Sequence, residues 1–136
     1  MSNETIEFEV LIKEAINGMK RAYAPYSKFQ VGAALLTDTG EIIRGCNIEN
    51  ASYGLTNCAE RTALFKAVSE GKVTFKAMAI VGDTPEPIAP CGACRQVIRE
   101  FCDKDMPIIL ANLKGDTHKT TISTLLPNSF GPNDLL

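Results

Sequence analysis

The stretch from Cys58-Ala59-Glu60 to Pro90-Cys91-Gly92-Ala93-Cys94 combines three thiols and one carboxylate in two short motifs. Three thiolates can hold a zinc ion and leave its fourth position open to water, whereas a structural zinc site is closed by a fourth protein ligand. A nearby carboxylate that does not bind the metal can move protons. The motifs predict one catalytic zinc ion per chain, held by Cys58, Cys91 and Cys94, with Glu60 as the catalytic acid–base.

Both motifs lie where a loop is expected to enter a helix. The pattern predicts one helix from Cys58 to Glu70, stopped by Gly71, and a second helix that begins near Cys91. The apolar face of the second helix carries Cys94, Val97, Ile98, Phe101 and Cys102. Two helices of one α/β domain can direct their N-termini to a common point, where their positive ends favour thiolates.

The rest of the chain alternates between helical and strand patterns. A helix is expected over residues 5–23, a hairpin over 29–36 and 41–47, and a loop over 48–57. Further strands are expected over 77–81, 107–113 and 118–122, with a loop over 82–90 and a helical turn at 125–126. This alternation predicts a single α/β domain over residues 1–136, with helices on both faces of the sheet.

Composition and charge exclude several classes of function. The 136 residues carry a net charge of −2 with no basic cluster, which argues against a nucleic-acid polymer as a partner. No apolar run is long enough to cross a membrane, and the N-terminus lacks the features of a signal peptide, so we expect a cytoplasmic location. Thiols stay reduced there, so Cys46 and Cys102 are interpreted as core residues rather than as a disulfide. His118, the only histidine, is not expected to bind the metal.

Each motif also has a plainer interpretation when it is taken alone. Asn57-x-x-Glu60 matches a helix-capping pattern, and Cys91-x-x-Cys94 could be a redox dithiol. A dithiol would not need Cys58 or Glu60, whereas a hydrolytic zinc site needs both. Zinc with three thiolates carries a net charge of −1, which opposes ionisation of a bound water. Arg61 is the candidate for compensating that charge, although it could also be an exposed helix arginine.

Together these motifs resemble the zinc deaminase pattern, with cysteine in place of the usual first-ligand histidine. Tyr26-Ser27-x-Phe29-x-Val31-Gly32-Ala33-Ala34 and the stretch from Gly45 to Tyr53 extend the similarity, as do Leu125-Leu126-Pro127 and Phe130. They resemble the short, tetrameric cytidine deaminases that act on free nucleosides. The resemblance covers nearly the whole chain.

The resemblance implies a three-layer α-β-α fold with a mixed, roughly five-stranded sheet. It implies hydrolytic deamination of cytidine and 2′-deoxycytidine to uridine and 2′-deoxyuridine, with release of ammonia, in pyrimidine salvage. It further implies a homotetramer with shared active sites. The residues implied to contact the substrate are Asn47 and Glu49 on the ribose, Phe29 on the ring or sugar, Ala59 and Glu60 on the cytosine edge, and from neighbouring subunits Ala51, Tyr53 and Phe130.

Without the resemblance, several of these residues would have ordinary interpretations. Asn47 and Glu49 would belong to a polar loop, Phe29 to a strand core, and Phe130 would be a stray exposed aromatic. Competing functions are deamination of another aminopyrimidine nucleoside such as blasticidin S, a non-catalytic zinc module with a fourth ligand, and a thiol oxidoreductase. The Asn47-x-Glu49 pair and Phe130 favour cytidine. The sequence gives no preference between cytidine and deoxycytidine.

Overall fold

The computed structural model describes residues 7–136 of the chain. Its helices are α1 (Phe8–Met19), α2 (Ala59–Ser69), α3 (Gly92–Phe101) and α4 (Ile122–Leu125), with short 3-10 turns η1 (Tyr53–Leu55) and η2 (Pro132–Asp134). Its strands are β1 (Val31–Thr37), β2 (Ile42–Cys46), β3 (Phe75–Gly82), β4 (Ile108–Asn112) and β5 (Thr117–Thr120). They form one sheet in the order β2-β1-β3-β4-β5, in which only the β3–β4 pair is parallel. The prediction of a mixed, five-stranded sheet is therefore confirmed.

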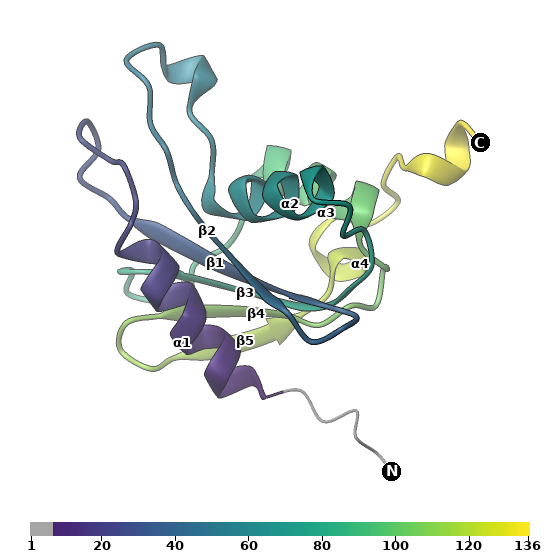
Figure 1. The fold of residues 1–136 in the computed structure, drawn as a ribbon, viewed down its shortest axis with the longest axis horizontal. Coiled ribbons are helices and arrows are strands. Elements are labelled where there is room, and N and C mark those ends of the chain that lie inside the picture. Colours follow the sequence, from purple (N-terminus) through teal and green to yellow (C-terminus); the bar gives the residue numbers. More distant parts are fainter. Residues whose placement is uncertain (1–6) are drawn as a thin grey trace.

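Helices cover both faces of this sheet, as predicted. Figure 1 shows α1 across one face and α2 with α3 across the other. Two glycines permit the close packing of helix on strand. A Cβ atom on Gly32 of β1 would lie 2.0 Å from the carbonyl oxygen of Ala15 in α1. A Cβ atom on Gly45 of β2 would lie 2.4 Å from the carbonyl oxygen of Ala59 in α2.

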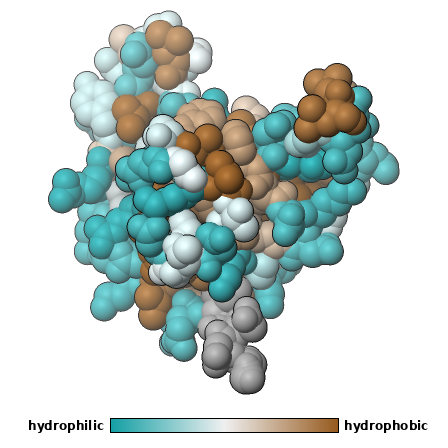
Figure 2. Space-filling view, turned by 45° about the vertical axis from the view of Figure 1, so that its right-hand side comes forward, coloured by the Kyte–Doolittle hydropathy of each residue, from teal (hydrophilic) through white to brown (hydrophobic). Residues whose placement is uncertain are grey.

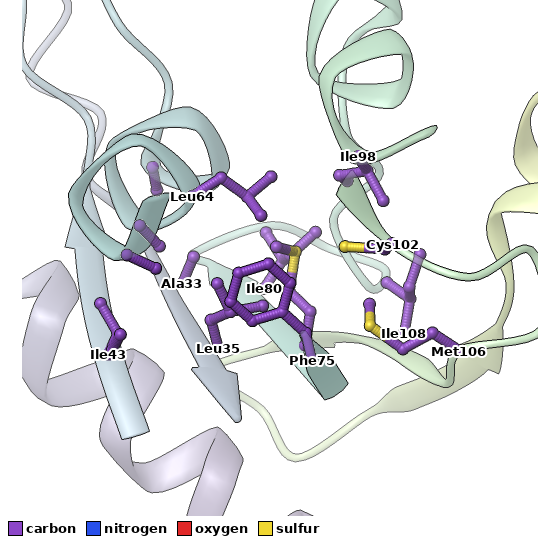
Figure 3. Packing of buried hydrophobic residues seen from close by; sticks show 14 of the residues in the cluster. Ala33, Leu35, Ile43, Leu64, Phe75, Ile80, Ile98, Cys102, Met106 and Ile108 are labelled. Carbon is purple, nitrogen blue, oxygen red and sulfur yellow. The ribbon is translucent and has the colours of Figure 1, made fainter. Parts of the chain in front are cut away.

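Each face of the sheet has its own apolar core. The larger core lies between the sheet and the helices α2 and α3, and Figure 3 shows Leu64 and Ile98 facing Ile80 and Ile108 across it. The smaller core lies beneath α1. Cys102 belongs to the larger core, which confirms its interpretation as a core residue. Cys46 is only half-buried at the end of the edge strand β2 and lies in neither core, so its interpretation as a core residue is wrong.

Two predicted boundaries are also wrong. The first helix ends at Met19 rather than near residue 23, and the part predicted for residues 5 and 6 lies outside the described residues. After Met19 the backbone turns tightly, and the Tyr23 amide donates 3.0 Å to the Asn47 carbonyl beyond β2. Near the C-terminus, the strand predicted for 118–122 stops at Thr120. Ile122 instead starts α4 and is buried in the larger core, so the helical turn lies earlier than predicted.

Two segments project from this framework. Figure 2 shows them as lobes with hydrophobic tips, separated by a hollowed face. The loop that contains η1 forms one, with Tyr53 and Leu55 largely exposed, and the C-terminal tail beyond α4 forms the other, with Phe130 and Leu135 exposed. Within residues 7–136, no helix is both long enough and apolar enough to cross a membrane.

Candidate metal centre and active site

The three cysteines of the two motifs meet at the N-termini of α2 and α3. Cys58 is the N-cap residue of α2, Cys91 is the N-cap residue of α3, and Cys94 lies in the first turn of α3. Neither N-cap side chain caps its own helix, so both thiols are free to turn toward each other. The three sulfur atoms lie within 4.8 Å of one another, and the Cys58 and Cys91 sulfurs are 3.7 Å apart.

This cluster has the chemistry of a zinc site. The Cys58 thiolate accepts hydrogen bonds from Cys94 and Arg61, which lower the pKa of Cys58 to about 5. The hydrogen bond that the Cys94 thiol donates to Cys58, together with burial, raises the pKa of Cys94 well above its usual range, and the negative charges of Glu60 and Cys58 add to the shift. A divalent cation removes that conflict by binding all three as thiolates. Among the described residues the cluster includes no fourth histidine, cysteine or carboxylate, so the donor set fits a zinc ion with an open position.

Glu60 lies beside the cluster without belonging to it. It is the second residue of α2 and is 3 % exposed. Burial raises the pKa of its carboxyl to about 7, and the negative charge of Cys58 adds to the shift. A carboxyl group in this range can both accept and release a proton near neutral pH, as a proton shuttle must.

Arg61 lies against the thiols from the same turn of α2. Its Nη2 donates to the Cys58 sulfur at 3.4 Å. Its Nε is buried and has no hydrogen-bond partner in the part of the chain that the structure describes. The guanidinium therefore places a positive charge next to a cluster of negative ligands, which is the location expected for charge compensation. An exposed helix arginine would not be held in this way.

A cavity of about 240 Å³ opens onto Cys58, Cys91 and Glu60. Phe29, Val31 and Ile88 supply apolar lining, and Asn47, Glu49 and Asn57 supply polar lining. Ala59 and Cys58 also line it. The cavity thus brings together, within one chain, most of the residues that the sequence predicts to contact substrate. Sequence reasoning misses Ile88 as a lining residue, because nothing in its local sequence distinguishes it from an ordinary loop residue, and it interprets Asn57 only as a possible helix cap.

Asn47 and Glu49 face the cavity but are also engaged with the protein. The Asn47 side chain is buried, accepts from the Val31 amide at 2.8 Å and donates to the Phe29 carbonyl at 2.8 Å. It thereby fixes the entry to β1, while one amide hydrogen and one oxygen lone pair remain for a ligand. The Glu49 carboxylate accepts from the Tyr26 and Ser27 amides at 3.0 and 3.1 Å and from the Ser27 hydroxyl. Sequence reasoning assigns no role to Ser27.

The residues predicted to act across subunits lie outside this cavity. Tyr53 lines a neighbouring cavity of about 390 Å³ with Tyr26, Ser27, Glu49 and Thr56, and its ring contacts the Tyr26 ring edge-on. Ala51 is exposed on the same projecting loop. Phe130 lies on the other projection, where its carbonyl accepts from Gln96 at 2.9 Å and its side chain is 59 % exposed.

Comparison with known proteins agrees with this geometry. Residues 6–110 match the family model described as the cytidine and deoxycytidylate deaminase zinc-binding region. A cytidine deaminase of Sporosarcina psychrophila is 58% identical over 130 residues, which cover 96% of each chain. The crystal structure of a cytidine deaminase from Burkholderia pseudomallei superposes with a TM-score of 0.90 at 51% identity, covering 92% of this chain and 100% of that one.

A more distant relative is a blasticidin-S deaminase of Bacillus cereus, which is 34% identical over 115 residues and covers 79% of this chain and 81% of its own. The two cytidine deaminases described above are more similar to this chain and match more of it. The sequence match, the structural match and the three converging thiols agree with one another, and the chain belongs to the cytidine and deoxycytidylate deaminase family.

Proposed function

We propose that this chain catalyses the zinc-dependent hydrolytic deamination of cytidine and 2′-deoxycytidine in pyrimidine salvage. The products are uridine or 2′-deoxyuridine and ammonia. The observation that carries the proposal is the meeting of three thiols beside one buried carboxyl group, with Cys58, Cys91 and Glu60 lining a cavity of about 240 Å³. A hydrolytic metal site needs this combination, and the relatives named as cytidine deaminases support the choice of substrate.

Zinc held by Cys58, Cys91 and Cys94 supplies a Lewis acid that makes water a nucleophile near neutral pH. The Glu60 carboxylate would take one proton from the attacking water and deliver it to N3 of the ring. It would then take the second proton, from the hydroxyl group added at C4, and deliver it to the amine, which leaves as ammonia when the C4–N bond breaks and the C4 carbonyl forms. Its burial excludes bulk water, so the proton stays between the carboxyl group and the substrate. Arg61 offsets part of the ligand charge through its hydrogen bond to Cys58.

The cavity walls account for binding of a small, neutral nucleoside. Phe29, Val31 and Ile88 offer apolar surface to the pyrimidine and the sugar. The Ala59 backbone and Glu60 lie where the cytosine edge would be read. Asn47 and Glu49 would hold the ribose hydroxyl. In this proposed arrangement the reacting edge of the base would lie near Cys58 and Cys91, and the sugar would lie near Asn47 and Glu49.

Two competing functions fit the geometry less well. A redox dithiol of Cys91 and Cys94 would not require a third thiol 3.7 Å away. A non-catalytic zinc module would require a fourth ligand, and the cluster contains none among residues 7–136. Blasticidin S is the alternative substrate to assay in parallel, because the relative that bears its name is also similar in sequence.

We propose further that the protein is a cytoplasmic homotetramer with shared active sites. All five cysteines are free, which suits a reducing compartment. The exposed Tyr53, Leu55 and Phe130 on the two projections are suited to contact neighbouring subunits.

The test is conversion of cytidine to uridine and ammonia by purified, zinc-analysed protein, in wild type and in Glu60→Gln. We expect turnover with about one zinc per chain in the wild type. General acid–base catalysis contributes about 10²–10⁴-fold, so Glu60→Gln should lose at least that factor and keep its zinc. Glu70→Gln, at the exposed end of α2, is the matched control and should retain full activity. Zinc-loaded wild type that leaves cytidine unchanged would refute the proposal.

A further inference from the structure

The turn before β1 is built around the carboxylate of Glu49. The Tyr26 and Ser27 amides donate to Oε1, and the Ser27 hydroxyl donates to Oε2. The Glu49 amide in turn donates 2.8 Å to the Tyr23 carbonyl, which anchors its backbone. Three donors from one turn therefore fix the direction of a side chain that lines both cavities.

The Ser27 hydroxyl cannot easily turn away from Glu49. Its oxygen accepts the Phe29 amide at 3.0 Å, and its single hydrogen is committed to the carboxylate. Phe29 is an apolar lining residue of the same cavity. One hydroxyl group thus links the polar and the apolar walls of the proposed sugar site.

The local backbone and charge favour the same arrangement. Lys28 adopts φ 61°, in the left-handed region that side-chain-bearing residues seldom occupy, and such strain is commonly found at functional sites. The hydrogen bond from the Ser27 hydroxyl makes the largest contribution to lowering the pKa of Glu49 below its usual range. The hydrogen bonds from the two amides and the nearby Lys28 charge lower this pKa further. The carboxylate therefore stays ionised and able to accept a hydrogen bond at neutral pH.

We propose that Ser27 is a positioning residue for nucleoside binding, which aims the Glu49 carboxylate at a sugar hydroxyl and holds Phe29 at the cavity wall. This inference rests on the proposed function. Oε2 accepts one described hydrogen bond, so it keeps lone-pair capacity for a donor from the ligand. The described hydrogen bonds of Ser27 join it to Glu49 and Phe29 and not to the thiols or Glu60, so we expect its effect on binding rather than on turnover.

The experiment measures KM and kcat for cytidine, and the Kd of uridine by calorimetry, in Ser27→Ala, Ser27→Thr and Ser27→Cys. A hydrogen bond to a charged group is involved, so Ser27→Ala should raise KM and the uridine Kd about tenfold while kcat changes less than about twofold. Ser27→Thr keeps the hydroxyl and should restore both values. Ser27→Cys, with a weaker donor, should be intermediate and serves if the alanine variant does not fold. Ser69→Ala on α2 is the matched control, because within residues 7–136 the Ser69 hydroxyl donates only to the Lys66 carbonyl.

A double-mutant cycle with Glu49→Ala separates positioning from general folding. If Ser27 acts through Glu49, then Ser27→Ala should add little to the KM of Glu49→Ala. A full additive effect in that background, or a loss of kcat at unchanged KM, would overturn the inference alone. A zinc-loaded wild type that neither binds uridine nor converts cytidine would instead overturn the proposed function, and the inference with it.

Discussion

At the scale of single residues, charge explains why the first turn of α2 carries both Glu60 and Arg61. Three thiolates around one divalent ion leave an excess negative charge, which opposes formation of hydroxide at the metal. The Arg61 guanidinium donates to the Cys58 sulfur at 3.4 Å, where it would offset that charge, and Glu60 lies outside the thiol cluster, where it would transfer protons. In the proposed mechanism, two adjacent residues of opposite charge thus serve one metal in different ways.

Cys102 offers a pH-dependent prediction at this scale. Burial raises the pKa of its thiol to about 12, from an ordinary value of 9.0. Between pH 9 and 12 the native thiol therefore stays protonated, whereas the same thiol in the unfolded chain loses its proton. This proton loss stabilises the unfolded state relative to the native state as the pH rises. We expect Cys102 to remove about 1 kcal/mol of unfolding free energy between pH 7 and pH 10.

Urea unfolding of wild type and Cys102→Ala at both pH values measures this contribution. The variant should be less stable at pH 7 because it leaves a cavity in the larger core. Between pH 7 and pH 10 the unfolding free energy of the variant should fall less than that of the wild type, because the variant lacks the Cys102 thiol. The other four cysteines are present in both proteins, so their contribution cancels in the comparison. Equal losses would mean that the buried thiol does not couple to folding.

The sequence predicts the chemistry of single residues well where the residue type is rare. Three cysteines and one glutamate in short motifs have few uses together, so the metal cluster can be inferred from the sequence alone. Ser27 cannot be inferred in the same way. Its role depends on a contact with Glu49, 22 positions away, and serine in a turn has a common local explanation.

At the scale of elements, the site depends on how closely α2 approaches β2. Gly45 makes that approach possible, since a Cβ there would lie 2.4 Å from the Ala59 carbonyl oxygen and 2.6 Å from the Ala63 amide nitrogen. Both atoms belong to the first turns of α2, directly after Cys58. The helix cannot move away from a larger side chain at position 45 without also moving its N-terminus, which carries Cys58 and Glu60.

We therefore expect Gly45→Ala to destabilise the protein by about 3 kcal/mol, as overpacking in a dense interior does. It should also release zinc to a chelator faster than the wild type. Urea unfolding and a metal-release assay measure the two effects. Gly54→Ala is the matched control, because a Cβ atom there would have nothing within 4 Å, and it should stay within about 0.5 kcal/mol. An unperturbed Gly45→Ala would show that α2 can shift without cost.

Elements are predictable where an apolar face or an apolar run lies between local stop signals. The apolar face of α3 and the apolar runs of β1, β3 and β4 follow this rule, and Gly71 marks the end of α2, with small errors at the ends. The early end of α1 is not predictable, because the Tyr23 amide leaves the helix to pair with Asn47. Likewise, the local sequence pattern at Ile122 favours a strand. The Ile122 side chain is instead buried in the larger core with Ile98 of α3, and the residue begins α4.

At the scale of the whole molecule, a single chain holds only part of the proposed site. Its cavity is lined by Cys58, Cys91, Glu60 and the expected ribose contacts, whereas Phe130 lies on a projection whose tip points away from the sheet. The hydrophobic tips in Figure 2 leave apolar side chains in water. Association of several copies would bury these residues and close the cavity. The proposed homotetramer therefore explains why the two projections carry exposed apolar side chains.

Mixing two damaged proteins tests whether sites are shared. Glu60→Gln should be inactive, and Phe130→Ala should lose about tenfold in activity if its ring packs on the ligand. In a mixed tetramer, a Phe130→Ala chain contributes an intact Glu60, and its Glu60→Gln neighbour contributes an intact Phe130. After the chains are dissociated and reassembled at equal amounts, about a quarter of the sites should be restored if one neighbour supplies Phe130 and the chains mix at random.

Light scattering before and after mixing should give four times the chain mass of 14.7 kDa. The control mixes Glu60→Gln with Glu60→Ala, in which every site lacks its proton shuttle and no recovery is expected. Activity equal to the sum of the two parents would place Phe130 in the site of its own chain, or outside any site. Recovery above that sum requires one chain to complete the site of another, because neither variant alone carries both intact residues.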